Sequence, residues 1–401
     1  MRISRAVLVL TLPVAAWAQM PISETEAIRL SLAREGLAEL EQGVMQAAEA
    51  EVTAAAQWPN PTLSYNRERT DGAFDTVEQS LVLGQTFDIS GRRGLRRDAA
   101  DRRIDIAGAE LAARRIELSG EVRRAFHELL FRQENVRAVE TWLGHFERME
   151  DLVDKLVRAG EASGYDRRRL ARERREIEAQ LATERAERER ERARLSALAG
   201  AGADPEVTGE LLPSAPPAVE QALARLKDRP DLVALGYRAD AAALEHRAAK
   251  RGAIPDISLG IGPKSVDNGI ATDDGLVLSI SAPLPIFDRN QADRQRAAAE
   301  ALQARGEYRL DLAHAEGELR GLHRQADGLR EAALDYRAEA VAATPELLRI
   351  AESAYAGGES SVLELLDAYR GALNVAINAN ELDKRARDAR IEFDLLTGSV
   401  Q

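Results

Sequence analysis

Cysteine is absent from the 401 residues, and aromatic side chains make up only 4% of them. Without cysteine the chain can form no disulfide, and thiolate metal sites are excluded. Beyond the first residues, no stretch approaches the 18 or so apolar residues that a membrane-spanning helix requires. If the chain crosses a membrane, it must therefore do so as β-strands, because only helices and closed sheets satisfy their backbone groups in lipid.

The residue types that carry catalysis and tight metal binding are also sparse. The five histidines show no metal-ligand spacing, and we expect each to lie in a helix seam or on the surface: His127, His145, His246, His314 and His323. No phosphate-binding glycine loop and no nucleophile–base pair is found. A net charge of −12 makes nucleic acid a poor partner. We therefore predict no enzyme, no cofactor and no bound metal.

Residues 1–18 are typical of a signal peptide. Arg2 and Arg5 precede the apolar run 6–16, and Ala16–Ala18 fits an A-x-A cleavage site. This apolar run is too short to span a bilayer as a helix. We expect export, with Gln19 as the mature N-terminus.

Helix-forming Ala, Leu, Arg and Glu dominate the rest, which reads as two copies of one pattern. Each copy is a helix, a β-hairpin, a very long helix, a turn and a long helix. The first repeat, 19–199, is predicted to contain helices at 23–57, 92–158 and 165–199, with strands at about 61–70 and 76–90. A Gly- and Pro-rich linker covers 200–218. The second repeat, 219–401, is predicted to contain helices at 219–250, from 291 onward and at 361–396, with strands at about 256–263 and 275–286.

The turns between the long helices carry the clearest local signals. Gly357 and Gly358 supply a backbone with positive φ, and Ser361 stands where a helix N-cap belongs. A second turn of this kind surrounds Gly160, about 200 residues upstream. Pro345 should break or kink the helix before the second turn, because proline lacks the N–H donor.

The strands alternate apolar and polar residues over about ten positions, as membrane strands do, although for an isolated hairpin of this kind a soluble hairpin is the favoured interpretation. Four strands cannot close a cylinder, since a single-chain membrane cylinder needs about eight. Three chains would supply twelve strands and twelve helices, and two similar halves from three subunits give nearly sixfold symmetry. The predicted fold class is therefore mainly α with a transmembrane β part: a homotrimer with a 12-stranded β-barrel on a 12-helix α-barrel.

Four motifs make the chain resemble the TolC-like outer-membrane efflux channel family over about residues 22–397. They are Trp58–Pro61, Gln85–Arg93, Pro283–Gln291 and Tyr355–Ala368. The third motif and the short C-terminus are most similar to the CzcC-type branch, which serves heavy-metal resistance-nodulation-division pumps. The resemblance implies an outer-membrane homotrimer of a Gram-negative bacterium with a periplasmic helical extension. It also implies contact with outer-membrane lipid, a periplasmic adaptor and an inner-membrane efflux pump.

The resemblance also implies roles for residues near the turns. Glu364 and Asp367 match the acidic pair that rings the tunnel constriction, although both would also suit a helix first turn through the helix dipole. Asp166 and Tyr355 match a link that holds the tip closed, but Ser360 stands where some members place its basic partner. The turns that an adaptor would grip contain Ala159, Gly160, Glu161, Gly357, Gly358 and Glu359.

Three functions follow in order of preference. The first is a passive exit duct for heavy-metal cations in a tripartite efflux pump. The second is the same kind of channel used for drug efflux or type I secretion. The third, from a different class, is a soluble periplasmic coiled-coil adaptor, which would need one helical hairpin where this chain has two.

Overall fold

The computed structural model describes residues 21–72, 75–200 and 205–398. The first half contains α1 (Glu24–Leu32), α2 (Glu35–Ala56), β1 (Thr62–Thr70), β2 (Thr76–Phe87), α3 (Arg92–Ala159) and α4 (Gly164–Ala199). The second half contains α5 (Val219–Arg225), the 3₁₀ turn η1 (Leu226–Asp228), α6 (Pro230–Arg251), β3 (Ile257–Asp267), β4 (Thr272–Ser281), α7 (Gln291–Tyr336), the π-helical turn η2 (Arg337–Val341), α8 (Ala342–Ala356) and α9 (Val362–Leu396). The predicted signal peptide, 1–18, lies outside the described residues.

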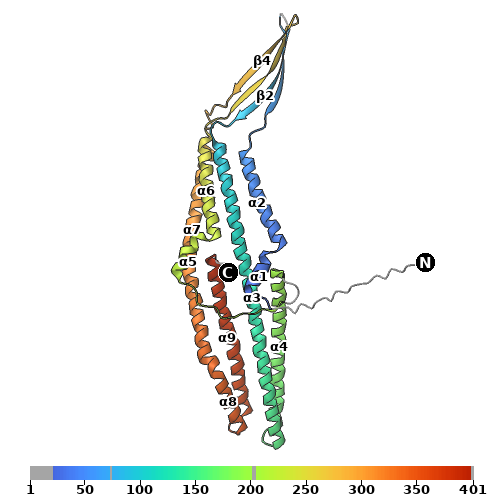
Figure 1. Ribbon diagram of the computed structural model, residues 1–401, viewed down its shortest axis with the longest axis vertical. Coiled ribbons are helices and arrows are strands. Elements are labelled where there is room, and N and C mark those ends of the chain that lie inside the picture. The colour runs from blue at the N-terminus through green and yellow to red at the C-terminus, as the bar shows by residue number, and fades with distance from the viewer. Residues whose placement is uncertain (1–20, 73–74, 201–204, 399–401) are drawn as a thin grey trace, which may run out of the picture.

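The molecule is a long rod with the sheet at one end and two helical hairpin tips at the other (Figure 1). Helix α3 has 68 residues and therefore extends roughly 100 Å. It packs against α4 in the first half, and α9 packs against both α7 and α3. This arrangement confirms the predicted order of a helix, a hairpin, a very long helix, a turn and a long helix in each half. No helix in the described ranges is both long and apolar enough to cross a lipid bilayer.

The sheet has strand order β1-β2-β3-β4, with every neighbouring pair antiparallel. Leu63, Leu83, Ile261 and Leu278 lie opposite one another and form one cross-strand row. The row three residues further toward the hairpin loops, and therefore on the opposite face, consists of Asn66, Ser80, Lys264 and Gly275. The predicted alternation is therefore confirmed, with one apolar face and one polar face. The central β2–β3 pairing joins the two halves of the chain.

The strand limits differ from prediction at four ends, one of which is the start of β4, at Thr272 rather than near residue 275. Strand β2 stops at Phe87 rather than near residue 90, and β4 stops at Ser281 rather than near 286. Apolar alternation continues through Leu284 and Ile286, but Pro283 and Pro285 have no N–H to donate to a neighbouring strand. Strand β3 extends to Asp267, four residues further than predicted, because its polar end still pairs with β4.

Two helices predicted as continuous are each divided. The helix over 23–57 is interrupted after Leu32, because Arg34 is extended (φ −69°, ψ 135°) and begins α2. Ser23 does cap α1, since its hydroxyl accepts from the Glu26 N–H at 3.2 Å. The helix over 219–250 divides into α5, η1 and α6, because Pro230 holds Arg229 in an extended conformation before α6.

Pro345 does not end its helix. The helix instead widens into the π turn η2 just before it, and Pro345 lies inside α8. Proline has no N–H for the carbonyl four residues earlier, so a wider turn next to it accommodates the missing hydrogen bond. The predicted kink is therefore a local change of helical register.

Charged side chains hold the middle of the rod together. Arg123 on α3 is buried and pairs with Glu24 on α1 and with Asp394 on α9, the latter at 3.0 Å. His127, one turn further on α3, contacts Glu24 at 2.9 Å. From α9, Arg387 donates to backbone carbonyls of the linker at Glu210, Leu211 and Leu212. The first helix, the linker and the last helix are thereby fastened to α3.

Candidate functional site at the hairpin tips

The tip between α3 and α4 is closed by backbone geometry and one polar pair. Gly160 has φ +82°, and the next N–H, of Glu161, donates to the Leu156 carbonyl at 2.9 Å. Ser163 then caps α4: its hydroxyl accepts from the Asp166 N–H, while the Asp166 carboxylate accepts from the Ser163 N–H at 3.0 Å. Such a reciprocal capping box satisfies two backbone donors and fixes where the returning helix begins.

The tip between α8 and α9 repeats these bonds 198 residues later. Gly358 has φ +72°, and the Glu359 N–H donates to the Ala354 carbonyl at 2.9 Å. Ser361 and Glu364 form the matching capping box, in which the Ser361 N–H donates to the carboxylate at 2.7 Å. The two predicted turns are therefore the same motif built twice. One detail of the prediction is wrong: Gly357 is helical (φ −80°), and only Gly358 has positive φ.

The structure places Tyr355 and Asp166 close together across the two hairpins. Tyr355 is 7% exposed and packs in a core with Leu170 and Val362. Its hydroxyl is buried and has no hydrogen-bond partner among the described residues. Burial, followed by the negative charge of Asp166, raises the pKa of Tyr355. The Ser360 hydroxyl is likewise buried without a partner in the described part of the chain. Tyr355 of the second hairpin therefore lies near Asp166 of the first, whose carboxylate already accepts from the Ser163 N–H at the cap of α4.

Glu364 and Asp367 both lie on the exposed side of the first turns of α9. The Glu364 carboxylate accepts a hydrogen bond from the Ser361 N–H at the start of α9. Between them, Leu365 and Leu366 face the core. The two carboxylates therefore project from one side of the tip, as a role at a tunnel mouth requires, and that role remains a prediction.

An ion pair that sequence analysis missed joins the hairpins just above the tips. Arg370 on α9 pairs with Glu173 on α4 through both carboxylate oxygens. Glu173 is buried although it belongs to a highly charged helix. The pair lies 197 residues apart in the sequence, so no local pattern could have indicated it.

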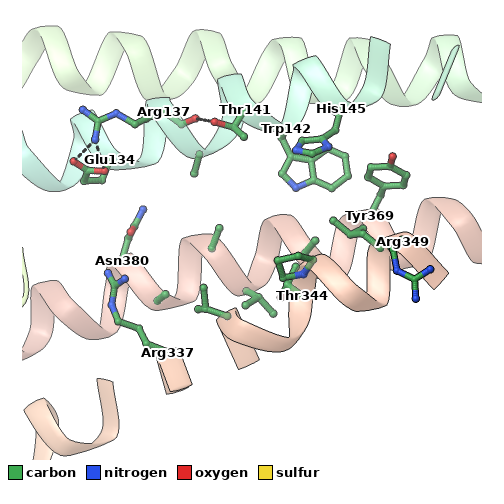
Figure 2. Close-up of a pocket in the computed structure, with 18 of the residues that line it drawn as sticks. Glu134, Arg137, Thr141, Trp142, His145, Arg337, Thr344, Arg349, Tyr369 and Asn380 are labelled. Carbon is green, nitrogen blue, oxygen red and sulfur yellow. Dashed lines mark hydrogen bonds and ion pairs between the residues drawn. The ribbon is translucent and has the colours of Figure 1, made fainter. Parts of the chain in front are cut away.

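A cavity of about 530 Å³ lies further along the rod between α3, α8 and α9 (Figure 2). The rings of Trp142 and Tyr369 meet edge to face with centroids 5.0 Å apart. Burial and a hydrogen bond to Glu352 raise the pKa of Tyr369. At the other end, Arg337 of the π turn pairs with Asp383, which is fully buried.

Within the residues that the structure describes, no group of three or more His, Asp or Glu side chains could hold a metal ion. His127 is occupied by Glu24, and His145 by Arg148 at 2.6 Å.

The sequence profile described as "Outer membrane efflux protein" matches residues 31–201 and again 219–399. The chain belongs to the outer membrane efflux protein family. The two matches correspond to the two halves of the structure, each with its own hairpin and tip. The chain is accordingly an outer-membrane efflux channel component whose helices extend into the periplasm.

Relatives of known identity agree with this assignment. The cobalt-zinc-cadmium resistance protein CzcC of Cupriavidus metallidurans is 28% identical over 368 residues, which cover 89% of this chain and 84% of the relative. The structure of CusC matches with a TM-score of 0.76 at 18% identity, covering 98% of this chain and 96% of the other. VceC from Vibrio cholerae matches with a TM-score of 0.75 at 21% identity, covering 94% and 96%. The family's fold is thus present over nearly the whole chain.

Proposed function

We propose that three copies of this chain form the outer-membrane exit duct of a tripartite resistance-nodulation-division pump that exports heavy-metal cations. The observation that carries the proposal is the two-sided sheet at one end of a rod whose longest helix, α3, extends roughly 100 Å. The apolar row through Leu83 and Ile261 suits lipid, while the row through Ser80 and Lys264 suits a water-filled interior. The helices then carry the conduit away from the membrane.

The need for three copies comes from the sheet edges. β1 and β4 each have a free side, and unpaired backbone groups cannot remain in lipid. Apolar side chains that no helix of this chain covers also lie along α7 and α8: Leu302, Leu310, Leu334, Leu347 and Ile350. Neighbouring copies would pair the free strand edges and bury these side chains. Three copies give twelve strands, which is a workable cylinder.

The cargo is inferred from the name of the relative and from the tips. CzcC carries cobalt, zinc and cadmium resistance in its name. Three copies of Glu364 and Asp367 around a narrow mouth would attract cations and repel anions. The glycine turns at Gly160 and Gly358 would meet a periplasmic adaptor, and the buried Tyr355 beside Asp166 would help keep the tips together.

The test is deletion of the gene in its host, followed by survival on cobalt, zinc and cadmium salts and, in parallel, on dyes and detergents. The proposal expects lower metal tolerance that the wild-type gene restores, with unchanged tolerance to dyes. Lost tolerance to dyes alone would favour a drug-efflux channel. A water-soluble monomer in cell fractions, in place of a heat-modifiable outer-membrane trimer, would refute the duct itself.

A further inference from the structure

Arginines crowd the junction between the sheet and the helices, although the chain as a whole is acidic. Residues 88–98, 249–256 and 284–296 together contain nine Lys or Arg and five Asp or Glu, in a chain of net charge −12. Figure 1 shows that these three segments meet where β2, β3 and β4 join α3, α6 and α7. His246 on α6 is half-buried, and burial lowers its pKa. The positive charges of Lys250, Arg305 and Arg294 lower this pKa further.

The apolar face of the sheet leads directly to the first turns of α3. Phe87 ends β2 and meets the Trp58 ring edge to face, with centroids 5.9 Å apart. The guanidinium of Arg93 lies over the Trp58 ring, 3.5 Å from the ring centroid, and donates to the Ala56 carbonyl at 3.2 Å. Trp58 is about half exposed. Arg93 is therefore held on the same side of the molecule as the apolar face.

Arg96 and Arg97 follow Arg93 at the three- and four-residue spacing that puts side chains on one face of a helix. Both are exposed. Arg97 reaches Asp101 only at 4.0 Å, and no carboxylate partner is recorded for Arg96 within the described residues. The face made by Arg93, Arg96 and Arg97, called here the arginine face, thus presents more positive charge than the single long ion pair of Arg97 with Asp101 offsets.

We infer that Trp58 and the arginine face bind the headgroup of an anionic glycerophospholipid at the periplasmic surface of the membrane. Arginine forks match the two free oxygens of a phosphodiester, and the tryptophan ring lies at the level between headgroup and acyl chains. Charge complementarity and continuity with the apolar face select lipid over other occupants. The inference rests on the proposed membrane-inserted trimer and adds the lipid class that it prefers.

The test uses the mature protein, residues 19–401, reconstituted in phosphatidylcholine vesicles that contain a tenth of either brominated phosphatidylglycerol or brominated phosphatidylcholine. Bromine in the acyl chains quenches tryptophan fluorescence only at close range. Of the three tryptophans, Trp17 belongs to the predicted signal peptide and is removed with it, and Trp142 is buried, so quenching in the mature protein reports on Trp58. We expect stronger quenching by phosphatidylglycerol in the wild type, decreasing as salt is raised.

The variant Arg96→Gln/Arg97→Gln should lose this preference. Each arginine near an anionic membrane surface contributes about fivefold, so the pair should reduce relative affinity for phosphatidylglycerol roughly 25-fold. The matched control is Arg168→Gln/Arg172→Gln on α4, two exposed arginines near the tip with the same change in charge. The control should keep the wild-type preference, and Trp58→Phe should remove the quenching signal.

Four results would overturn the inference. The first two are equal quenching by both lipids in the wild type and an unchanged lipid preference in Arg96→Gln/Arg97→Gln. The third is loss of the trimer in that variant, which would make the arginines a subunit contact. The fourth is displacement of the lipid by inorganic phosphate to a greater extent than by sodium chloride at equal ionic strength. Failure of the proposed function looks different, because the wild type would then neither enter vesicles as a trimer nor conduct ions. A conducting trimer without lipid preference contradicts only the inference made here.

Discussion

The charge on Glu24 should decide whether α1 stays docked on α3. The Glu24 side chain is 22% exposed and contacts both His127 and Arg123. Burial alone would raise the pKa of Glu24, but the hydrogen bond from His127 and the charge of Arg123 lower it from 4.5 to about 2. That difference corresponds to about 3 kcal/mol in favour of the docked, ionised form.

The perturbation is Glu24→Gln, which keeps the shape and removes the charge. Because the pKa of Glu24 is lowered in the folded protein, its contribution is complete above pH 4.5 and is lost as the pH falls toward 2. At pH 7 the variant should therefore lack about 3 kcal/mol of docking free energy. In hydrogen exchange, the amides of α1 should exchange about a hundredfold faster than in the wild type.

The matched control is Glu35→Gln, in the first turn of α2, where the carboxylate is exposed and forms no recorded ion pair among the described residues. Exchange in α1 should stay at the wild-type rate in this control. Wild-type protection of α1, corrected for intrinsic rates, should also decline between pH 4.5 and 2, whereas the Glu24→Gln variant should show little further change. Equal exchange rates in Glu24→Gln and the wild type at pH 7 would refute the reasoning.

Three further outcomes follow from the structure. Ser361→Ala removes the cap of α9 and should lower the free energy of unfolding by about 1 kcal/mol, measured by thermal unfolding, without altering channel block by divalent cations. Glu364→Gln should keep the cap and weaken that block in planar-bilayer conductance. An unaltered block would show that the Glu364 carboxylate does not line the lumen. Gly262→Ala would put a Cβ 1.8 Å from the Leu81 carbonyl oxygen, so the heat-modifiable trimer should be lost, while Gly275→Ala, with 4.0 Å of room, should assemble normally. Arg337→Met leaves the fully buried Asp383 without its partner and should lower the free energy of unfolding by about 3–5 kcal/mol. Asp383→Asn should lower it less, because Arg337 can turn toward water. A lower melting temperature for Asp383→Asn than for Arg337→Met would contradict this account.

The tips could be predicted because their determinants are local. Glycine at positive φ and a serine three residues before an acidic residue define a helix end and a helix start within a few residues. The same reasoning failed where two local signals compete. Leu284 and Ile286 continue the strand alternation while Pro283 and Pro285 forbid it, and in the structure the missing donors prevail.

Other features depend on contacts between distant parts of the chain. No sequence pattern near Arg34 predicts the interruption between α1 and α2. The interruption lies where α1 docks on α3. The pairing of Arg123 with Asp394 joins residues 271 positions apart, and Glu173 is buried only because Arg370 arrives from the other hairpin. Periodicity predicts which helices form, but it cannot identify which charged residues become buried between them.

The pairing of β2 with β3 sets the order in which this molecule can be made. Its partners, such as Leu83 and Ile261, are separated by almost half of the chain, so the centre of the sheet cannot form until the second hairpin has been synthesised and exported. Long-range pairing of this kind is slow because a large loop must close first. The first hairpin therefore reaches the periplasm before its partner strands do, with its apolar face still uncovered.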